Sequence, residues 1–119
     1  MSDKKKILVV EDEKNVALLI KEELKDEGYD VKVAYSGEEA LDILKKEDFD
    51  AITLDIEMPG MNGLEVAGKI REFKKNARII LLSAYSHYKS DFSSWAADAY
   101  VIKSSNLSEL KETLKRLMG

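Results

Sequence analysis

Short runs of aliphatic residues recur along the chain, and each is separated from the next by a segment of different character. The runs occupy residues 7–10, 51–54, 79–82 and 100–102. Continuous aliphatic runs of this length are typical of strands buried on both faces of a parallel sheet. The stretch Asp30–Ala34 differs, because Lys32 lies between two valines and gives one face a polar side chain, as in an edge strand. The chain is therefore expected to form a five-stranded parallel sheet.

Four of the intervening segments have apolar residues at the spacing of one helix face. They contain Val16, Leu19, Ile20 and Leu24, then Ala40, Leu41 and Leu44, then Leu64, Ala67 and Ile70, and finally Leu107, Leu110, Leu114 and Leu117. Gly28 is placed to end the first helix. Ser36 and Glu39 have the spacing of a capping box for the second. Asn106 and Glu109 are placed in the same way to cap the last.

The alternation of strands and helices predicts an α/β fold of the doubly wound type. Right-handed crossovers between parallel strands place helices on both faces of an open sheet. Functional sites in such sheets form beyond the carboxyl ends of the strands. The residues that follow each strand are therefore the first place to look for chemistry.

Length and composition limit the classes of function. The 119 residues suit one compact domain, so residues 1–119 are expected to form a single domain with no second, output domain. Lys and Arg number 19 against 23 Asp and Glu, which argues against nucleic acid as the main partner. The absence of cysteine excludes disulfide scaffolds and thiol catalysis. No apolar run approaches the ~20 residues that cross a bilayer, so a cytoplasmic protein without membrane contact is expected.

Five polar residues follow the strands at one predicted edge of the sheet. They are Glu11, Asp12, Asp55, Ser83 and Lys103. Carboxylates that meet at one edge repel one another unless a cation is present. A hard divalent ion with oxygen ligands is the natural partner for such a cluster, and Mg²⁺ fits best.

Four motifs carry these residues in order along the chain. They are Val-Val-Glu11-Asp12-Glu13, Leu54-Asp55-Ile-Glu-Met-Pro59-Gly-Met-Asn-Gly63, Ser83-Ala84 and Tyr100-Val-Ile-Lys103. With them the chain resembles the response-regulator receiver domain of two-component signalling, in particular the single-domain regulators of the chemotaxis type. The resemblance covers essentially the whole chain and implies a flavodoxin-like (βα)5 fold with strand order 2-1-3-4-5.

The resemblance also implies a phosphoacceptor and a metal site. Asp55 would receive a phosphoryl group from a phosphohistidine on a sensor histidine kinase or a histidine phosphotransfer protein. Asp12 would bind Mg²⁺ directly, and Glu11 would do so directly or through water. Asp55 and the main-chain carbonyl of Glu57 would supply further oxygens.

Three more residues receive roles from the resemblance. Lys103 would pair with the phosphoryl oxygens, the Ser83 hydroxyl would bond to one of them, and Tyr100 would take part in the switch. The surface expected to switch comprises the fourth helix, which is expected as a short helix over residues 88–95, the fifth strand and the helix at residues 107–117. The chain departs from the family in having Ser104 where proline usually follows the lysine. A trans bond is predicted between Lys103 and Ser104, because a cis bond before a non-proline residue costs about 3–4 kcal/mol.

Three functions compete on this fold. The leading one is a monomeric phosphoacceptor that is not an enzyme beyond self-phosphorylation from small donors and slow autodephosphorylation, and that signals to an unknown protein. The alternative is a receiver-like binding module that acts without phosphorylation. A small flavin protein is disfavoured, because Glu11, Asp12 and Glu13 would repel a phosphate after the first strand.

Overall fold

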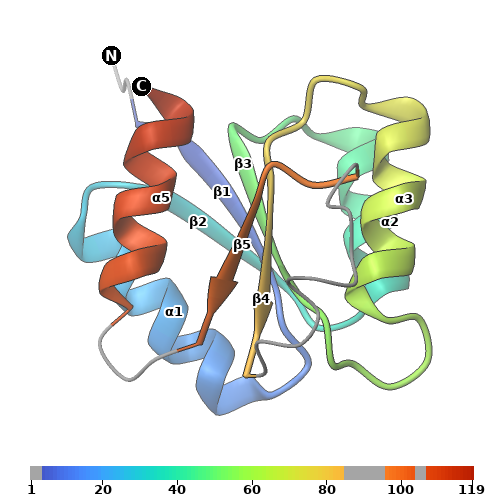
Figure 1. Cartoon of the computed structure of the whole chain (residues 1–119), viewed down its shortest axis with the longest axis horizontal. Helices are drawn as coiled ribbons and strands as arrows, with labels where there is room; N and C mark the ends of the chain where they lie inside the picture. The colour runs from blue at the N-terminus through green and yellow to red at the C-terminus, as the bar shows by residue number, and fades with distance from the viewer. Residues whose placement is uncertain (1–3, 85–95, 104–106) are drawn as a thin grey trace.

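A single parallel sheet organises the chain, with strand order β2-β1-β3-β4-β5 (Figure 1). A computed structural model describes residues 4–84, 96–103 and 107–119. The strands are β1 (Lys6–Val10), β2 (Asp30–Ala34), β3 (Ala51–Asp55), β4 (Ile79–Ser83) and β5 (Ala99–Ile102). The helices of the described residues are α1 (Lys14–Asp26), α2 (Gly37–Lys46), α3 (Gly63–Phe73) and α5 (Ser108–Met118).

The observed sheet confirms the predicted α/β fold and the predicted strand order. All four strand pairings are parallel. The strand with the polar residue, β2, lies at an edge of the sheet as expected. Because the strands run in one direction, their carboxyl ends gather at the lower edge of the sheet in Figure 1. All of the predicted site residues follow or end a strand at this edge, apart from Tyr100, which lies within β5.

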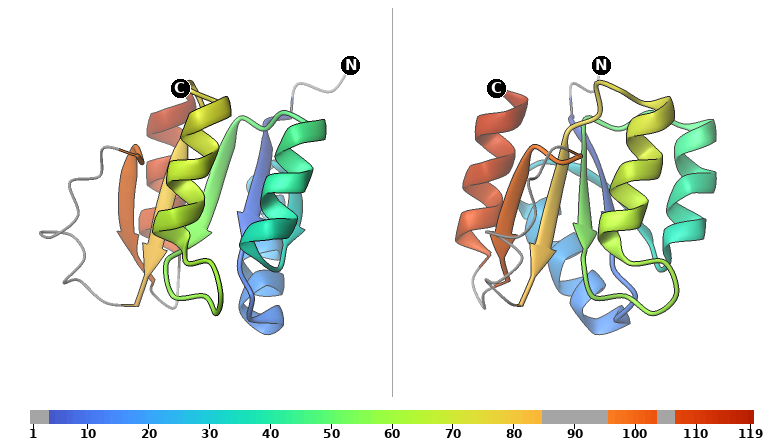
Figure 2. Two further views of the ribbon diagram at one scale, coloured as in Figure 1. Left: turned by 90° about the vertical axis from the view of Figure 1, so that its right-hand side faces the viewer. Right: turned by 45° about the vertical axis from the view of Figure 1, so that its right-hand side comes forward.

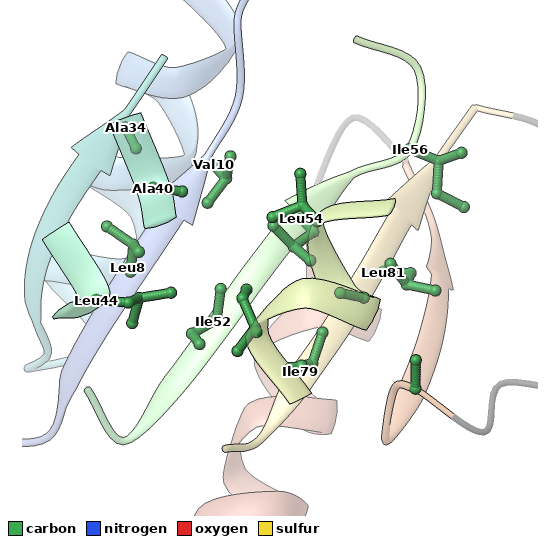
Figure 3. Close-up of a cluster of buried hydrophobic side chains, with 14 of the residues drawn as sticks. Leu8, Val10, Ala34, Ala40, Leu44, Ile52, Leu54, Ile56, Ile79 and Leu81 are labelled. Atoms are coloured by element: carbon green, nitrogen blue, oxygen red, sulfur yellow. The ribbon is translucent and has the colours of Figure 1, made fainter. Parts of the chain in front are cut away.

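Two layers of helices cover the sheet, α2 and α3 on one face and α1 and α5 on the other (Figure 2). Figure 3 shows the first layer's apolar cluster, in which Ile52 and Leu54 of β3 meet side chains of the helices. The opposite face of β3 contributes Ala51 to the second cluster, with Ile20 of α1 and Leu110 of α5. Strands covered on both sides need apolar residues at every position, which explains the continuous aliphatic runs.

The helix ends agree with the sequence in part. Gly28, just beyond α1, has a φ of +94°, a left-handed conformation that glycine adopts without strain. Ser36 caps α2 by accepting the backbone N–H of Glu39. A capping box also requires the Glu39 side chain to accept the backbone N–H of Ser36. This part of the prediction is wrong, because the Glu39 carboxylate accepts the N–H of Tyr35 instead. The N-cap of α5 is Leu107, one residue later than predicted, and its carbonyl accepts the first helical bond.

Two predictions lie outside the described residues. They concern the fourth helix, predicted over residues 88–95, and the trans bond between Lys103 and Ser104. Among the described helices, none has both the length and the apolar character needed to pass through a membrane.

Candidate functional site

The end of β1 places two carboxylates at the edge of the sheet. The N–H of Glu11 donates to the carbonyl of Ala34 at 3.0 Å, which continues the ladder one residue beyond the strand. The Glu11 side chain is only 2% exposed, and its Oε2 accepts the N–H of Glu13 at 3.2 Å. Asp12, the next residue, is half-buried. The end of β1 therefore offers one buried carboxylate and one that is more accessible.

Asp55 is the last residue of β3, and its side chain is also buried, with 3% exposure. The N–H of Glu57 donates to its Oδ1 at 3.2 Å. Helix α3 begins very close behind it, because a Cβ on Gly63 would collide with the Asp55 carbonyl oxygen and lie 2.9 Å from the Cα of Ile56. Only glycine lets the helix start this close to the aspartate. The position of Asp55 is thus set by both the strand and the helix start.

Lys103 brings a positive charge to the two buried carboxylates. Its N–H donates to the carbonyl of Ser83 at 2.8 Å, which aligns the residue after β5 with the end of β4. Its ammonium nitrogen lies 3.1 Å from Asp55 Oδ1 and 3.2 Å from Glu11 Oε1. One ammonium therefore faces two carboxylates, and the cluster retains excess negative charge when all its acids are ionised.

The pKa values of the cluster reflect this imbalance. Burial, followed by repulsion from the Asp55 carboxylate, raises the pKa of Glu11 to about 7. Burial also raises the pKa of Asp55, against the opposing attraction of Lys103. For Lys103 burial acts to lower the pKa, but Asp55 and Glu11 outweigh it and the net direction is upward. The lysine is therefore charged at neutral pH, whereas burial disfavours the ionised forms of the two carboxylates.

A divalent cation would offset the negative charge of these carboxylates. Glu11, Asp12 and Asp55 each offer a carboxylate oxygen, and these oxygens all lie within 4.8 Å of one another. In the described part of the chain, Glu11 Oε1 is buried without a hydrogen bond, and the Lys103 ammonium lies 3.2 Å from it. Hard oxygen ligands with one side open to water suit Mg²⁺. The three carboxylates could therefore hold a metal ion.

Ser83 ends β4 and is fully buried. Its hydroxyl donates to Glu57 Oε2 at 2.6 Å, and the N–H of Ala84 approaches Glu57 Oε1 at 3.5 Å. The sequence assigned only the main-chain carbonyl of Glu57 to the site and missed this carboxylate. The available signal was a second acidic side chain two residues after Asp55, beside a strand that ends in serine.

Tyr100 is partly buried on β5 opposite Leu81, against the cluster of the α2 and α3 face.

A buried aspartate flanked by acidic side chains, with a lysine and a serine at the carboxyl edge of a 2-1-3-4-5 parallel sheet, is the arrangement of a receiver domain. The profile of the response regulator receiver domain matches residues 7–115. The chain belongs to this family, which is part of two-component signalling.

Known relatives agree with that assignment. The response regulator ArlR of Staphylococcus saprophyticus is 35% identical over 114 residues, which are 95% of this chain and 52% of that protein. The chain thus spans about half the length of the curated relatives it matches. The chemotaxis protein CheY4 of Vibrio cholerae superposes with a TM-score of 0.88 at 30% identity, covering 96% of this chain and 98% of that one.

Two solved structures involve the response regulator TrrA of Thermotoga maritima. One is TrrA in complex with Mg²⁺ and BeF, with 61% identity, a TM-score of 0.91 and coverage of 95% of this chain and 98% of that one. The other is the histidine kinase ThkA in complex with TrrA, at 60% identity and a TM-score of 0.90, covering 97% of this chain and 99% of that one.

Proposed function

We propose that this chain is a phosphoacceptor, in which Asp55 receives a phosphoryl group from a phosphohistidine. The observation that carries the proposal is the buried Asp55 carboxylate with the Lys103 ammonium 3.1 Å from its Oδ1, beside two further carboxylates. The same proposal assigns Mg²⁺ to Glu11, Asp12, Asp55 and the main-chain carbonyl of Glu57. The complex of TrrA with Mg²⁺ and BeF supports this assignment.

The transfer places few demands on the protein beyond position and charge. A carboxylate oxygen of Asp55 forms the new P–O bond while the P–N bond of the phosphohistidine breaks. The electron pair of that bond stays on the imidazole nitrogen, so Asp55 gives up no proton if it is ionised at the start. Attraction by the Lys103 ammonium favours the ionised form of Asp55 against the effect of burial, and this ammonium would neutralise a phosphoryl oxygen. Bound Mg²⁺ would supply further neutralisation of the phosphoryl charge.

Ser83 and Tyr100 complete the proposal. The Ser83 hydroxyl would donate to a phosphoryl oxygen, and Tyr100 would respond to the new position of Ser83. The readout is a change in the surface formed by the fourth helix, β5 and α5. The proposal assigns this chain no catalytic activity beyond self-phosphorylation from small donors and slow autodephosphorylation.

The partner that donates the phosphoryl group is a sensor histidine kinase or a histidine phosphotransfer protein. The complex of the kinase ThkA with TrrA supports this class of partner. The downstream partner is an unidentified protein and not nucleic acid or a membrane. Residues 1–119 act as one receiver domain, which by its resemblance and its composition is monomeric and cytoplasmic.

Intact-mass spectrometry tests the proposal. The protein is incubated with acetyl phosphate and Mg²⁺, and it should gain the mass of one phosphoryl group. Asp55→Asn should abolish the gain, whereas Asp42→Asn, an exposed aspartate on α2, should not. Labelling that persists in Asp55→Asn would overturn the assignment of the phosphoacceptor. A wild type that is never labelled, by acetyl phosphate or by a phosphorylated kinase, would favour the binding module that acts without phosphorylation.

A further inference from the structure

The side chain of Glu57 makes a contact that the phosphoacceptor chemistry does not require. Its Oε2 accepts the Ser83 hydroxyl at 2.6 Å, and the serine is fully buried while the glutamate is half-buried. A hydroxyl that donates to a carboxylate over so short a distance forms a strong, charge-assisted hydrogen bond. This bond fixes the Ser83 side chain in the unphosphorylated protein.

Serine has only one proton to donate. The proposed function requires that proton for a phosphoryl oxygen on Asp55. The Ser83 hydroxyl therefore cannot donate to Glu57 and to the phosphoryl group in the same state. The two bonds define two alternative positions of one donor.

Glu57 is also connected to the phosphoacceptor itself, because its N–H donates to Asp55 Oδ1 at 3.2 Å. A phosphoryl group on Asp55 would bring further negative charge close to the Glu57 carboxylate. Like charges in a partly buried site repel strongly. Phosphorylation thus attracts the Ser83 proton and repels the acceptor that holds it.

We propose that Glu57 is a positioning residue that holds Ser83 in the unphosphorylated arrangement, so that binding of a phosphoryl group must displace the Ser83–Glu57 hydrogen bond. This inference rests on the proposed function and adds a competing acceptor to it. The strength of the hydrogen bond that Glu57 accepts sets the free energy needed to release the Ser83 hydroxyl to the phosphoryl group. A receiver with a weaker acceptor at this position switches more readily.

The test measures the affinity of the whole chain for beryllofluoride in Mg²⁺, followed by ¹⁹F NMR. Beryllofluoride is a phosphoryl mimic, so no kinase is needed. Glu57→Ala should bind it about tenfold more tightly than wild type, because the competing hydrogen bond to a charged group is gone. Glu57→Gln, which keeps a neutral acceptor, should lie between the two. Glu13→Gln, an exposed glutamate after β1, measures the effect of removing one nearby negative charge.

A double-mutant cycle separates the hydrogen bond from simple charge. In a Ser83→Ala background the gain from Glu57→Ala should shrink to that of Glu13→Gln, because no hydroxyl remains to be released. In a Ser83→Thr background, which restores a hydroxyl, the larger gain should return. An equal gain from Glu57→Ala in the wild-type and Ser83→Ala backgrounds would overturn the proposal, as would no gain in the wild type. Melting curves of each variant establish that it is folded, and Ser83→Gly replaces Ser83→Ala as the background without a hydroxyl if the latter does not fold.

Failure of the proposed function gives a different result. If the wild type bound neither beryllofluoride with Mg²⁺ nor a phosphoryl group at Asp55, both the phosphoacceptor and the competing bond would be wrong. If the wild type bound beryllofluoride and the cycle were additive, only the role of Glu57 would be wrong.

Discussion

At the scale of single residues, Thr53 places a hydroxyl in an apolar layer. It lies in the middle of β3 between Val9 of β1 and Ile80 of β4, is fully buried, and its Oγ1 has no hydrogen-bond partner in the described part of the chain. A buried polar group without a partner is destabilising. Thr53→Val, which replaces the hydroxyl by a methyl of similar size, should raise the free energy of unfolding by about 1 kcal/mol.

Urea unfolding checks this prediction. Thr53→Ser is the matched control, because it keeps the hydroxyl and removes the methyl, and it should be destabilising. If Thr53→Val lowered the stability as well, the hydroxyl would have to be making a stabilising interaction in the folded protein.

Glu11 makes the stability of the metal-free protein depend on pH. Its pKa is raised in the folded state from 4.5 to about 7. Between these values the folded protein binds more protons than the unfolded chain, so the free energy of unfolding should fall as the pH rises. The fall from this group is at most about 3 kcal/mol. Glu11→Gln, which is neutral throughout, should remove it.

The measurement is urea unfolding in EDTA between pH 5 and pH 8. Asp55, whose pKa is also raised, remains in the variant, so a smaller pH dependence should persist there. Identical pH slopes for the wild type and Glu11→Gln would mean that Glu11 is ionised in the folded protein at all these pH values.

Single-residue roles were only partly predictable from the sequence. The placement of Glu11, Asp55 and Lys103 at one edge of the sheet was predictable, because parallel strands bring their carboxyl ends to the same edge. The bond from Ser83 to Glu57 was not, since it depends on how the chain turns after β3 and on the rotamer of a long side chain. The unpaired hydroxyl of Thr53 was equally hidden, because threonine is common in strands.

At the scale of elements, helix α3 contains two glycines that should respond oppositely to alanine. A Cβ on Gly63 would strike the backbone of Asp55 and Ile56, whereas a Cβ on Gly68 would meet nothing within 4 Å. Gly68→Ala should stabilise the protein by about 0.5–1 kcal/mol through helix propensity. Gly63→Ala should destabilise it by about 1–3 kcal/mol, because backbone must move.

Chemical denaturation gives both stability values, and phosphorylation by acetyl phosphate gives a second readout. Gly63→Ala should also slow phosphorylation of Asp55, since the displaced backbone carries the phosphoacceptor, while Gly68→Ala should leave the rate unchanged. Equal stability changes in the two variants would show that the start of α3 adjusts freely.

The strands were predictable to within one residue at each end. Aliphatic runs mark strands clearly when both faces are covered, and Gly28 marks the end of α1. Helix starts were less certain. The capping box of Asn62 and Glu65 at the start of α3 was missed although its spacing is visible, and capping of α5 was placed one residue early. Caps depend on local backbone angles that several neighbouring polar residues can satisfy.

At the scale of the whole molecule, the alternation of strands and helices predicts a parallel sheet with helices on both faces. It does not predict the order of the strands. Right-handed crossovers allow several orders for five parallel strands. The order 2-1-3-4-5 was taken from the resemblance to receiver domains, and the structure confirms it. This order makes β1 and β3 neighbours, and therefore brings the carboxylates after β1 within reach of Asp55. The acidic site is thus a consequence of strand order.

The strand order also links metal binding to the stability of the entire fold. Glu11, Asp12 and Asp55 come from two strand ends that are adjacent only in the folded chain. A ligand that binds the folded state alone stabilises it by mass action, by about 1.4 kcal/mol at ten times its dissociation constant. For a domain of this size Mg²⁺ should therefore raise the melting temperature by about 5 °C.

The matched variants are Asp12→Ala, which removes an accessible carboxylate from the cluster, and Asp42→Ala, which removes an exposed aspartate from α2. Both lose one negative charge, so they respond alike to any general effect of ionic strength. Thermal melts with Mg²⁺ and with EDTA, at constant ionic strength, should show a full shift for Asp42→Ala and almost none for Asp12→Ala. A full shift in Asp12→Ala would place the ion elsewhere on the protein. Because the cluster exists only when β1 and β3 are paired, loss of the shift in Asp12→Ala alone would locate the coupling between metal and fold at this edge of the sheet.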